Sequence, residues 1–407
     1  MKDMQEQQVE TLLRRTVQVH TAEELRRKLE RAGGEGRPLR IKFGADPSAP
    51  DIHLGHVVAL NKLREFQELG HEVIFIIGDF TGMIGDPSGR TRTRPPLTRE
   101  EVERNARTYR EQVFRFLIPE KTRIRFNSEW CDPLNFADVI RLAGRVTVAQ
   151  MLARDDFSRR YAEGQPISLV EFLYPLIQAY DSVVIEADVE VGGTDQLFNM
   201  LLGRELQREM GREPQVVMTL PLLEGIDGVQ KMSKSLGNYI AVNDPPDEIF
   251  GKCMSVNDEL MWRYLDLVLC RSEDELARLR REVDAGNVNP RDVKLDMAEE
   301  IVRRIHGEDQ ARRARENFLR IFSRRQTPES VPEVEVTVIS GEAIAVLDLI
   351  MSAGLAPSRS EARRLIEQGA VRIDGRRVGD VGEKIVLLAE GVLLKVGKRR
   401  FARLVPA

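Results

Sequence analysis

Cysteine is scarce in this chain of 407 residues. Because Cys131, Cys253 and Cys270 are odd in number and widely spaced, the sequence argues against a disulfide framework and a cysteine-type zinc site, and favours a reducing cytoplasm. The chain lacks an apolar run long enough to cross a bilayer, and its charged N-terminus lacks the apolar stretch of a secretory signal. It also lacks the GxxxxGKS/T pattern, which argues against a P-loop.

Charge is distributed unevenly along the chain, although the net charge is only −4. The length predicts two or three domains, and 42% apolar with 31% charged residues is typical of a soluble globular protein. Residues 341–407 hold 12 Lys and Arg against 8 Asp and Glu, so this segment is basic and the rest is acidic. A basic module on an acidic body predicts a polyanionic partner, although an ordinary basic tail has the same charge.

An alternation of strands and helices predicts an α/β domain with a parallel, doubly wound sheet. Residues 39–43 read as a strand, residues 51–69 as a helix, and the apolar residues 73–77 as a strand buried on both faces. Strand, helix and strand in this order form a parallel βαβ unit. A helix over residues 9–33 precedes this unit, and a further strand is expected over residues 188–191.

Composition divides the chain into four expected segments. Charged, helix-rich sequence follows the α/β part, and a stretch rich in Pro, Glu and Thr precedes the basic module. The expected segments are a catalytic domain over 1–224 with a helical insertion over about 99–180, a helical region over 225–325, a linker over 326–340 and a small α+β module over 341–407.

The string His53-Leu-Gly55-His56 falls where the first predicted strand gives way to a helix. Both histidines project from the first helical turn, beside unpaired backbone N–H groups and the positive end of the helix dipole. Imidazole N–H groups there can donate to phosphate oxygens, and Gly55 lets a flat ring approach the backbone. The alternative is a pair of histidines with structural hydrogen bonds.

The string Lys231-Met232-Ser233-Lys234-Ser235 lies in a loop bounded by glycines. Two ammonium groups on a mobile loop can neutralise a pyrophosphate leaving group. Alone, the string is more typical of a solvated surface loop than of such a site. Together with an anion-binding helix start on a parallel sheet, it predicts a nucleotide site.

The two strings in this order resemble the ATP-binding motifs of class I aminoacyl-tRNA synthetases. The resemblance implies a Rossmann-like catalytic domain that activates an amino acid with ATP and passes it to tRNA. It implies His53, His56, Lys231 and Lys234 as catalytic residues. The ATP-binding residues that it implies are Gly44, Asp46, Gly55, Gly193, Asp195, Met232, Ser233, Arg90 and Arg94. Mg²⁺ would accompany ATP, held mostly by phosphates and water, with no permanent cofactor.

Tyr174, Gln178 and Asp181 share one face of a predicted helix, at i, i+4 and i+7. Spacing alone also fits the exposed stripe of an amphipathic helix. With the Gly192-Gly193-Thr194-Asp195-Gln196 string, however, the pattern resembles tyrosyl-tRNA synthetases. The resemblance implies that Asp181 accepts the phenol hydroxyl of tyrosine, that Tyr174, Gln178 and Asp86 hold the α-amino group, and that Gln196 contacts the substrate.

Lys42 departs from that family, many members of which have a tyrosine at this position. We assign it to the tyrosine pocket, where a lysine can donate to the phenol, pair with Asp181 or point elsewhere. The runner-up substrate is tryptophan, because tryptophanyl-tRNA synthetases share the two ATP motifs.

The basic module begins with a predicted capping box, Ser358 to Glu361, and contains a hairpin over 371–378 with an Asp-Gly turn. Its pattern resembles the S4 RNA-binding domain, which implies contacts with RNA backbone and shape. The tRNA-binding residues so implied are Arg359, Arg363, Arg364, Lys398, Arg399 and Arg400.

These resemblances together imply a cytoplasmic, bacterial-type tyrosine–tRNA ligase that acts on tRNA(Tyr) as a homodimer and binds neither membranes nor DNA. Two other classes remain open. One is an RNA-binding protein on a synthetase fold that has lost catalysis, and the other is a small-molecule adenylating enzyme. The first is disfavoured because both the histidine string and the lysine loop are intact, and the second because of the Tyr174 helix and the S4-like module.

Overall fold

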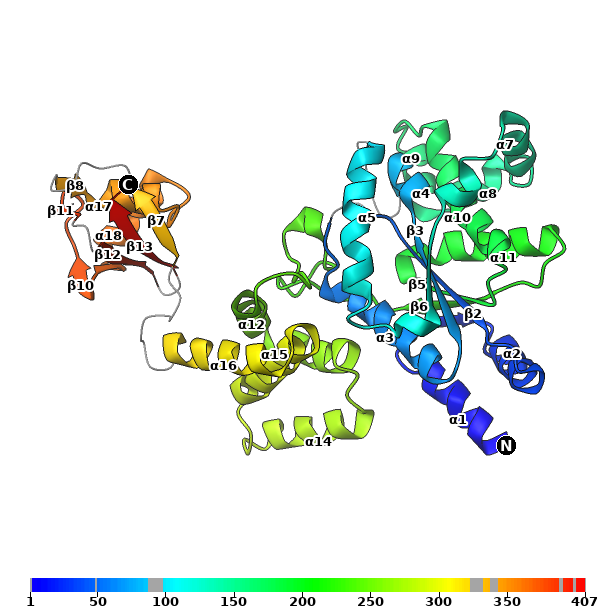
Figure 1. Ribbon diagram of the computed structural model, residues 1–407, viewed down its shortest axis with the longest axis horizontal. Coiled ribbons are helices and arrows are strands. Elements are labelled where there is room, and N and C mark those ends of the chain that lie inside the picture. The colour runs from blue at the N-terminus through cyan, green and yellow to red at the C-terminus, as the bar shows by residue number, and fades with distance from the viewer. Residues whose placement is uncertain are drawn as a thin grey trace. The chain divides into compact units, whose positions relative to one another are not determined.

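The computed structural model describes residues 2–47, 50–86, 98–322, 332–336, 343–387, 391–397 and 400–406. The chain divides into two compact units, Met1–Arg315 and Glu316–Ala407, drawn in Figure 1. Each unit has its own sheet and is described by itself. Among the described residues, no helix is long and apolar enough to cross a membrane.

The first unit is built on a six-stranded sheet in the order β1-β6-β5-β2-β3-β4. The strands are β1 (Gln18–His20), β2 (Arg40–Ala45), β3 (Glu72–Ile77), β4 (Thr122–Phe126), β5 (Val189–Gly193) and β6 (Val216–Leu220). All neighbours pair in parallel except β1, which pairs antiparallel with β6 at the edge. The predicted parallel βαβ unit is confirmed, because β2 and β3 pair in register from Arg40 and Glu72 onward.

Helices flank this sheet along the first unit (Figure 1). They are α1 (Lys2–Leu13), α2 (Ala22–Glu35), α3 (Leu54–Glu68), α4 (Asp79–Ile84), α5 (Arg99–Val113), α6 (Ser128–Cys131), α7 (Phe136–Ala143), α8 (Val148–Leu152), α9 (Asp155–Ala162), α10 (Leu169–Val184) and α11 (Leu197–Glu209). The single helix expected over 9–33 is wrong, because β1 separates α1 from α2. The Thr21 side chain caps α2 by accepting from the N–H of Glu24.

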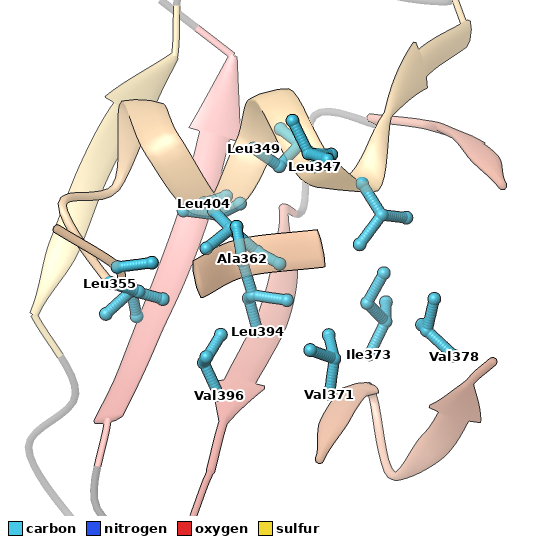
Figure 2. Close-up of a cluster of buried hydrophobic side chains, with 14 of the residues drawn as sticks. Leu347, Leu349, Leu355, Ala362, Val371, Ile373, Val378, Leu394, Val396 and Leu404 are labelled. Carbon is cyan, nitrogen blue, oxygen red and sulfur yellow. The ribbon is translucent and has the colours of Figure 1, made fainter. Parts of the chain in front are cut away.

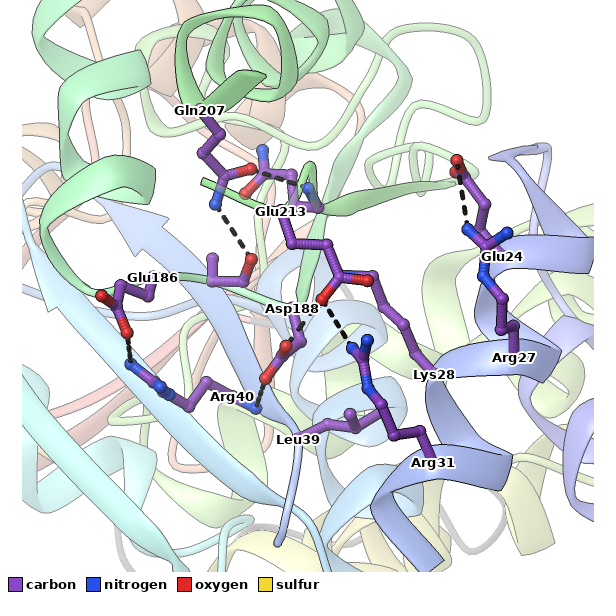
Figure 3. Close-up of polar contacts among 12 residues, drawn as sticks. Glu24, Arg27, Lys28, Arg31, Leu39, Arg40, Glu186, Asp188, Gln207 and Glu213 are labelled. Carbon is purple, nitrogen blue, oxygen red and sulfur yellow. Dashed lines mark hydrogen bonds and ion pairs between the residues drawn. The ribbon is translucent and has the colours of Figure 1, made fainter. Parts of the chain in front are cut away.

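A network of charged side chains ties α2 to the N-terminal ends of the strands (Figure 3). The Asp188 carboxylate, just before β5, accepts from Arg37 Nη2 at 2.9 Å and from the backbone N–H of Arg40 at 2.8 Å. On α2, Arg31 pairs with Glu213 at 2.5 Å, and burial lowers the pKa of Lys28. These contacts lie at the end of the sheet opposite the cavity described below, so they bear on stability rather than on a ligand.

A helical region follows β6. It contains the short 3-10 turn η3 (Lys234–Leu236), α12 (Pro246–Ser255), α13 (Asp258–Arg263), the π-helical turn η4 (Tyr264–Val268), α14 (Glu273–Asp284), α15 (Pro290–His306) and α16 (Glu308–Phe322). Asn61 on α3 donates to the carbonyls of Leu267 and Val268, which fastens this region to the α/β part. The helix-rich character expected of the sequence after the α/β part is therefore observed.

The second unit combines two helices with short strands around one apolar core. Its elements are β7 (Glu333–Val336), β8 (Ala343–Ala345), α17 (Val346–Ser352), α18 (Arg359–Glu367), β9 (Val371–Ile373), β10 (Arg376–Val378), β11 (Lys384–Val386), β12 (Val392–Val396) and β13 (Arg400–Pro406). The strands form sheets in the orders β10-β9-β12-β13-β7 and β11-β8. Leu349, Ala362 and Leu394 are among the buried side chains of this core (Figure 2).

Two local predictions for this unit are altered by the structure. Ser358 caps α18 as expected, but the Glu361 carboxylate pairs with Arg400 at 3.0 Å instead of completing a capping box. The stretch expected to be a linker contains β7, which pairs in parallel with β13. The hairpin of β9 and β10 is present, with positive φ at Asp374 and Gly375 as its tight turn requires.

Candidate functional site

One cavity of about 680 Å³ lies at the C-terminal ends of β2 and β5. Ligands of parallel sheets bind at this end of the strands. The predicted site residues that line the cavity are Gly44, Asp46, His53, Gly55, His56, Asp86, Tyr174, Gln178, Asp181, Gly193, Asp195, Gln196, Lys231, Met232, Ser233 and Lys234. Arg90 and Arg94 lie outside the described residues.

The two histidines form the N-terminal cap of α3. The backbone N–H of Gly55 donates to His53 Nδ1 at 3.2 Å, and the N–H of His53 donates to His56 Nδ1 at 3.3 Å. Because each Nδ1 accepts a hydrogen bond, a neutral ring carries its proton on Nε2. Burial, with the nearby Lys234 cation, lowers the pKa of His56 to about 4, and burial also lowers the pKa of His53. Both rings are thus neutral Nε2–H donors at pH 7.

Gly55 is required at this turn for a steric reason. A Cβ at this position would lie 2.9 Å from the His53 ring and 3.6 Å from Met232 Cβ. The missing side chain therefore lets the His53 ring fold back onto the helix start and lets the lysine loop approach it.

The lysine loop is held in a defined conformation by a buried asparagine. Asn238 Oδ1 accepts from the backbone N–H of Ser233 at 2.8 Å, and its Nδ2 donates to Asp227 at 2.7 Å. The N–H of Met232 donates to the carbonyl of Leu223 at 2.7 Å. Sequence reasoning missed Asn238, although a polar residue directly after Gly237 in this motif was a visible signal.

Helix α10 carries the predicted triplet into the cavity. The Tyr174 hydroxyl donates to Asp46 Oδ2 at 2.8 Å, and burial beside Asp46 and Asp86 raises the pKa of Tyr174. Asp181 Oδ1 accepts from Trp130 Nε1 at 2.8 Å. Burial raises the pKa of Asp181 to about 7, against the opposing effects of the Lys42 cation and the Trp130 hydrogen bond. Sequence reasoning missed Trp130, because α6 is remote from α10 in sequence.

The placement of Lys42 in the tyrosine pocket is corrected by the structure. Lys42 is fully buried and does not line the cavity. Its ammonium pairs with Glu190 at 2.9 Å and donates to the Gln178 carbonyl and the Ser182 hydroxyl. The physical reason is register: β2 and β5 are parallel neighbours in which Lys42 stands opposite Glu190, so the cation meets a buried carboxylate.

The family model described as tRNA synthetases class I (W and Y) matches residues 34–323. The chain belongs to this family. The S4 domain model matches residues 347–386.

Related proteins resemble this synthetase along nearly all of its length. A tyrosine–tRNA ligase of Oleidesulfovibrio alaskensis is 54% identical over 98% of this chain and 99% of its own. One of Thermotoga maritima is 52% identical over 98% of this chain and 97% of its own. The tyrosyl-tRNA synthetase of Archaeoglobus fulgidus complexed with L-tyrosine has a TM-score of 0.62 at 24% identity. It covers 76% of this chain and 99% of its own, and this likeness concerns the fold alone.

The predicted tRNA-binding residues of the synthetase lie in the second unit. On α18, Arg359, Arg363 and Arg364 are all exposed, and Arg359 also pairs with Asp348 at 2.7 Å. Arg400, on β13, donates to the carbonyl of Leu355 and pairs with Glu361. Lys398 and Arg399 lie outside the described residues.

Proposed function

We propose that this synthetase is a tyrosine–tRNA ligase. It forms tyrosyl-adenylate and pyrophosphate from tyrosine and ATP, then transfers the tyrosyl group to tRNA(Tyr). The observation that carries the proposal is one cavity lined by both histidines, both lysines and the Asp181 pocket. The name shared by relatives more than 50% identical over nearly the whole chain supports tyrosine rather than tryptophan.

The ATP side of the cavity is proposed to act by charge stabilisation. Neutral Nε2–H groups of His53 and His56, with the ammonium groups of Lys231 and Lys234, would donate to phosphate oxygens as pyrophosphate leaves. Asp195 is proposed to hold the ribose. Mg²⁺ is proposed to enter with ATP, bound mainly by its phosphates.

The tyrosine side is proposed to select its substrate by hydrogen bonding. Trp130 donates to Oδ1 of Asp181 and Asn127 also hydrogen-bonds this carboxylate, which still has lone pairs that can accept the phenol hydroxyl. Phenylalanine would leave this buried carboxylate without that donor. Asp86, Tyr174 and Gln178 are proposed to hold the ammonium group, at the end of the pocket that Gln196 also lines.

The tRNA is proposed to contact the second unit and the helical region. The exposed Arg363 and Arg364 supply phosphate-binding charge on α18. The helical region over 225–325 is proposed as the anticodon-side part of the chain.

A homodimer is proposed through an apolar surface on the helical insertion. Phe136 and Leu169 are 79% and 81% exposed, and Ile140, Val148 and Tyr161 are also exposed. Exposed apolar side chains gathered on α7 to α10 indicate a protein interface. We propose that a second copy of the chain covers them.

The test is amino-acid-dependent ATP–pyrophosphate exchange with the full chain, comparing tyrosine, tryptophan and phenylalanine. Exchange with tyrosine alone is expected. Exchange with tryptophan would support the proposed activation reaction but would contradict tyrosine as the substrate. The absence of exchange with all three would favour a paralogue that binds RNA without catalysis.

A further inference from the structure

Asn199, on α11, is buried beside the amino-acid end of the cavity. We infer that Asn199 is a positioning residue that fixes which end of the Gln178 and Gln196 amides faces the substrate ammonium. The inference rests on the proposed function, because it concerns how the same pocket recognises an amino acid.

The direction of the Asn199 amide is set by an arginine. Arg154 Nη1 donates to Asn199 Oδ1 at 3.3 Å, and the Arg154 side chain is itself buried and paired with Asp156 at 2.7 Å. A guanidinium has donors and no acceptor, so it holds the oxygen of Asn199 toward itself. The Asn199 NH₂ group is thereby turned toward the two glutamines.

The same NH₂ group orients both glutamines of the pocket. Asn199 Nδ2 donates to Gln178 Oε1 at 2.8 Å and to Gln196 Oε1 at 3.3 Å. The opposite end of Gln196 donates to Asp86 Oδ2 at 2.9 Å. Each amide therefore has its oxygen on the Asn199 side, and each oxygen keeps a second lone pair for a cationic donor.

A buried ion pair sets the other end of this chain of hydrogen bonds. Gln178 Nε2 donates to Glu190 Oε1 at the longer distance of 3.4 Å. Glu190 is paired with Lys42 at 2.9 Å and accepts from Ser182 at 3.2 Å, so it is held as a carboxylate that only accepts. If Gln178 were reversed, its oxygen would face Glu190 and its NH₂ would face the Asn199 donor.

The contacts thus run in one direction, from an obligatory donor at Arg154 to an obligatory acceptor at Glu190. Every amide between them has a single satisfied orientation, and in that orientation Gln178 offers oxygen to the cavity that it lines. An ammonium group requires acceptors, so the arrangement suits the amino end of a free amino acid. It also gives Lys42 a role behind the pocket, through its ion pair with Glu190, which lines the cavity.

The test replaces Asn199 by leucine, which has a similar volume and no hydrogen-bonding group. Dissociation constants are measured for tyrosine, for tyramine, which keeps the ammonium, and for 3-(4-hydroxyphenyl)propionate, which lacks it. We expect N199L to raise the dissociation constants of tyrosine and tyramine by about tenfold or more, and to change that of 3-(4-hydroxyphenyl)propionate by less than about twofold. Glu190→Gln, at the other end of the chain, is expected to produce the same selective loss and serves if N199L does not fold.

The matched control is Asn61→Leu. Like Asn199, Asn61 donates two hydrogen bonds from its side-chain amide, but its acceptors are backbone carbonyls and it does not line the cavity. It should lower stability without changing the ratio of the three constants. Equal weakening of all three ligands in N199L, or unchanged binding, would overturn the inference while leaving the proposed function intact. A wild-type protein that binds no tyrosine would overturn both.

Discussion

Lys231 and Asp195 form an ion pair between the lysine loop and the end of β5, with 2.8 Å between Nζ and Oδ2. Both side chains line the cavity, and they are 43% and 25% exposed. An exposed pair of this kind contributes at most about 1 kcal/mol. In the proposed ATP complex, the triphosphate would therefore draw Lys231 away from Asp195 and leave that carboxylate available to the ribose.

Removing either loop lysine should slow activation of the amino acid. Lys231→Ala and Lys234→Ala are expected to reduce the rate of adenylate formation by roughly 10²-fold, with little change in tyrosine affinity, because the charges act on the leaving pyrophosphate. Single-turnover kinetics and equilibrium binding separate the two effects. Lys294→Ala is the control, because Lys294 lies outside the cavity and pairs with Asp258. An equal loss of tyrosine binding would refute this role.

The His56 ring should make stability depend on acid pH. Its folded-state pKa is lowered from 6.5 to about 4, so the unfolded chain binds the proton more tightly and stability is lost as pH falls from 6.5 to 4. His56→Gln keeps a side chain suited to the cap and removes the titrating ring. In denaturant unfolding, the stability that this variant loses between pH 6.5 and pH 4 should be smaller than in the wild type by on the order of 2 kcal/mol. Adenylate formation should be slower.

His71 provides the control for that experiment. Its pKa is also lowered to about 4 by burial, and its Nδ1 accepts from the backbone N–H of Leu39, away from the cavity. His71→Gln should therefore change acid stability in the same direction and leave adenylate formation unchanged. A His56→Gln protein with the wild-type pH dependence of stability would contradict the neutral-ring interpretation.

Asp181 should show a conflict between stability and substrate binding. Its pKa is raised from 3.8 to about 7, so the folded state holds the proton more tightly and the carboxylate lowers stability increasingly as pH rises from 3.8 to 7. Asp181→Asn is expected to raise stability at pH 8 by roughly 2 kcal/mol and to weaken tyrosine binding severely. Thermal unfolding at pH 8 and pH 5 tests the first claim. The exposed Asp284→Asn is the control, and a destabilised D181N at pH 8 would count against the assignment.

Removing the second unit should separate the two half-reactions. Because β7 pairs with β13, a cut at residue 341 would leave β7 without its partner strand, and the deletion is better made over 323–407. The shortened protein is expected to retain tyrosine-dependent ATP–pyrophosphate exchange and to lose most tRNA charging. In the full chain, Arg363→Gln with Arg364→Gln should weaken tRNA binding and reduce its salt dependence. Normal charging after the deletion would exclude RNA binding by this unit.

A charge placed on the apolar surface of the insertion should prevent dimer formation. Leu169→Asp is expected to convert the protein to a monomer in sedimentation experiments, because an exposed leucine at an interface would become a buried, unpaired carboxylate. Val386→Asp, at an exposed apolar position in the second unit, should leave the oligomeric state unchanged. A wild-type monomer at micromolar concentration would exclude the proposed dimer.

Local sequence patterns were sufficient to predict much of the fold and part of the candidate site. The position of His53 between a strand and a helix predicted its place at the cavity. The i, i+4, i+7 spacing placed Tyr174 and Asp181 on one helix face, and only the resemblance to tyrosyl-tRNA synthetases assigned that face to the pocket. Partners distant in sequence could not be found in this way. Nothing near Lys42 indicates that Glu190 stands opposite it, and nothing near Asp181 indicates Trp130. The helix expected over 9–33 was wrong because strand β1 gains its hydrogen bonds only from β6.

The capping role of His53 and His56 changes what their presence in a sequence means. Each ring satisfies a backbone donor at the start of α3, so a descendant that no longer activated an amino acid would still gain stability by keeping both. The exposed Lys231 contributes little to stability, so it would be the first of these residues to be substituted once selection for amino-acid activation ceased. We therefore expect a relative that has lost catalysis to lose the loop lysine before it loses either histidine.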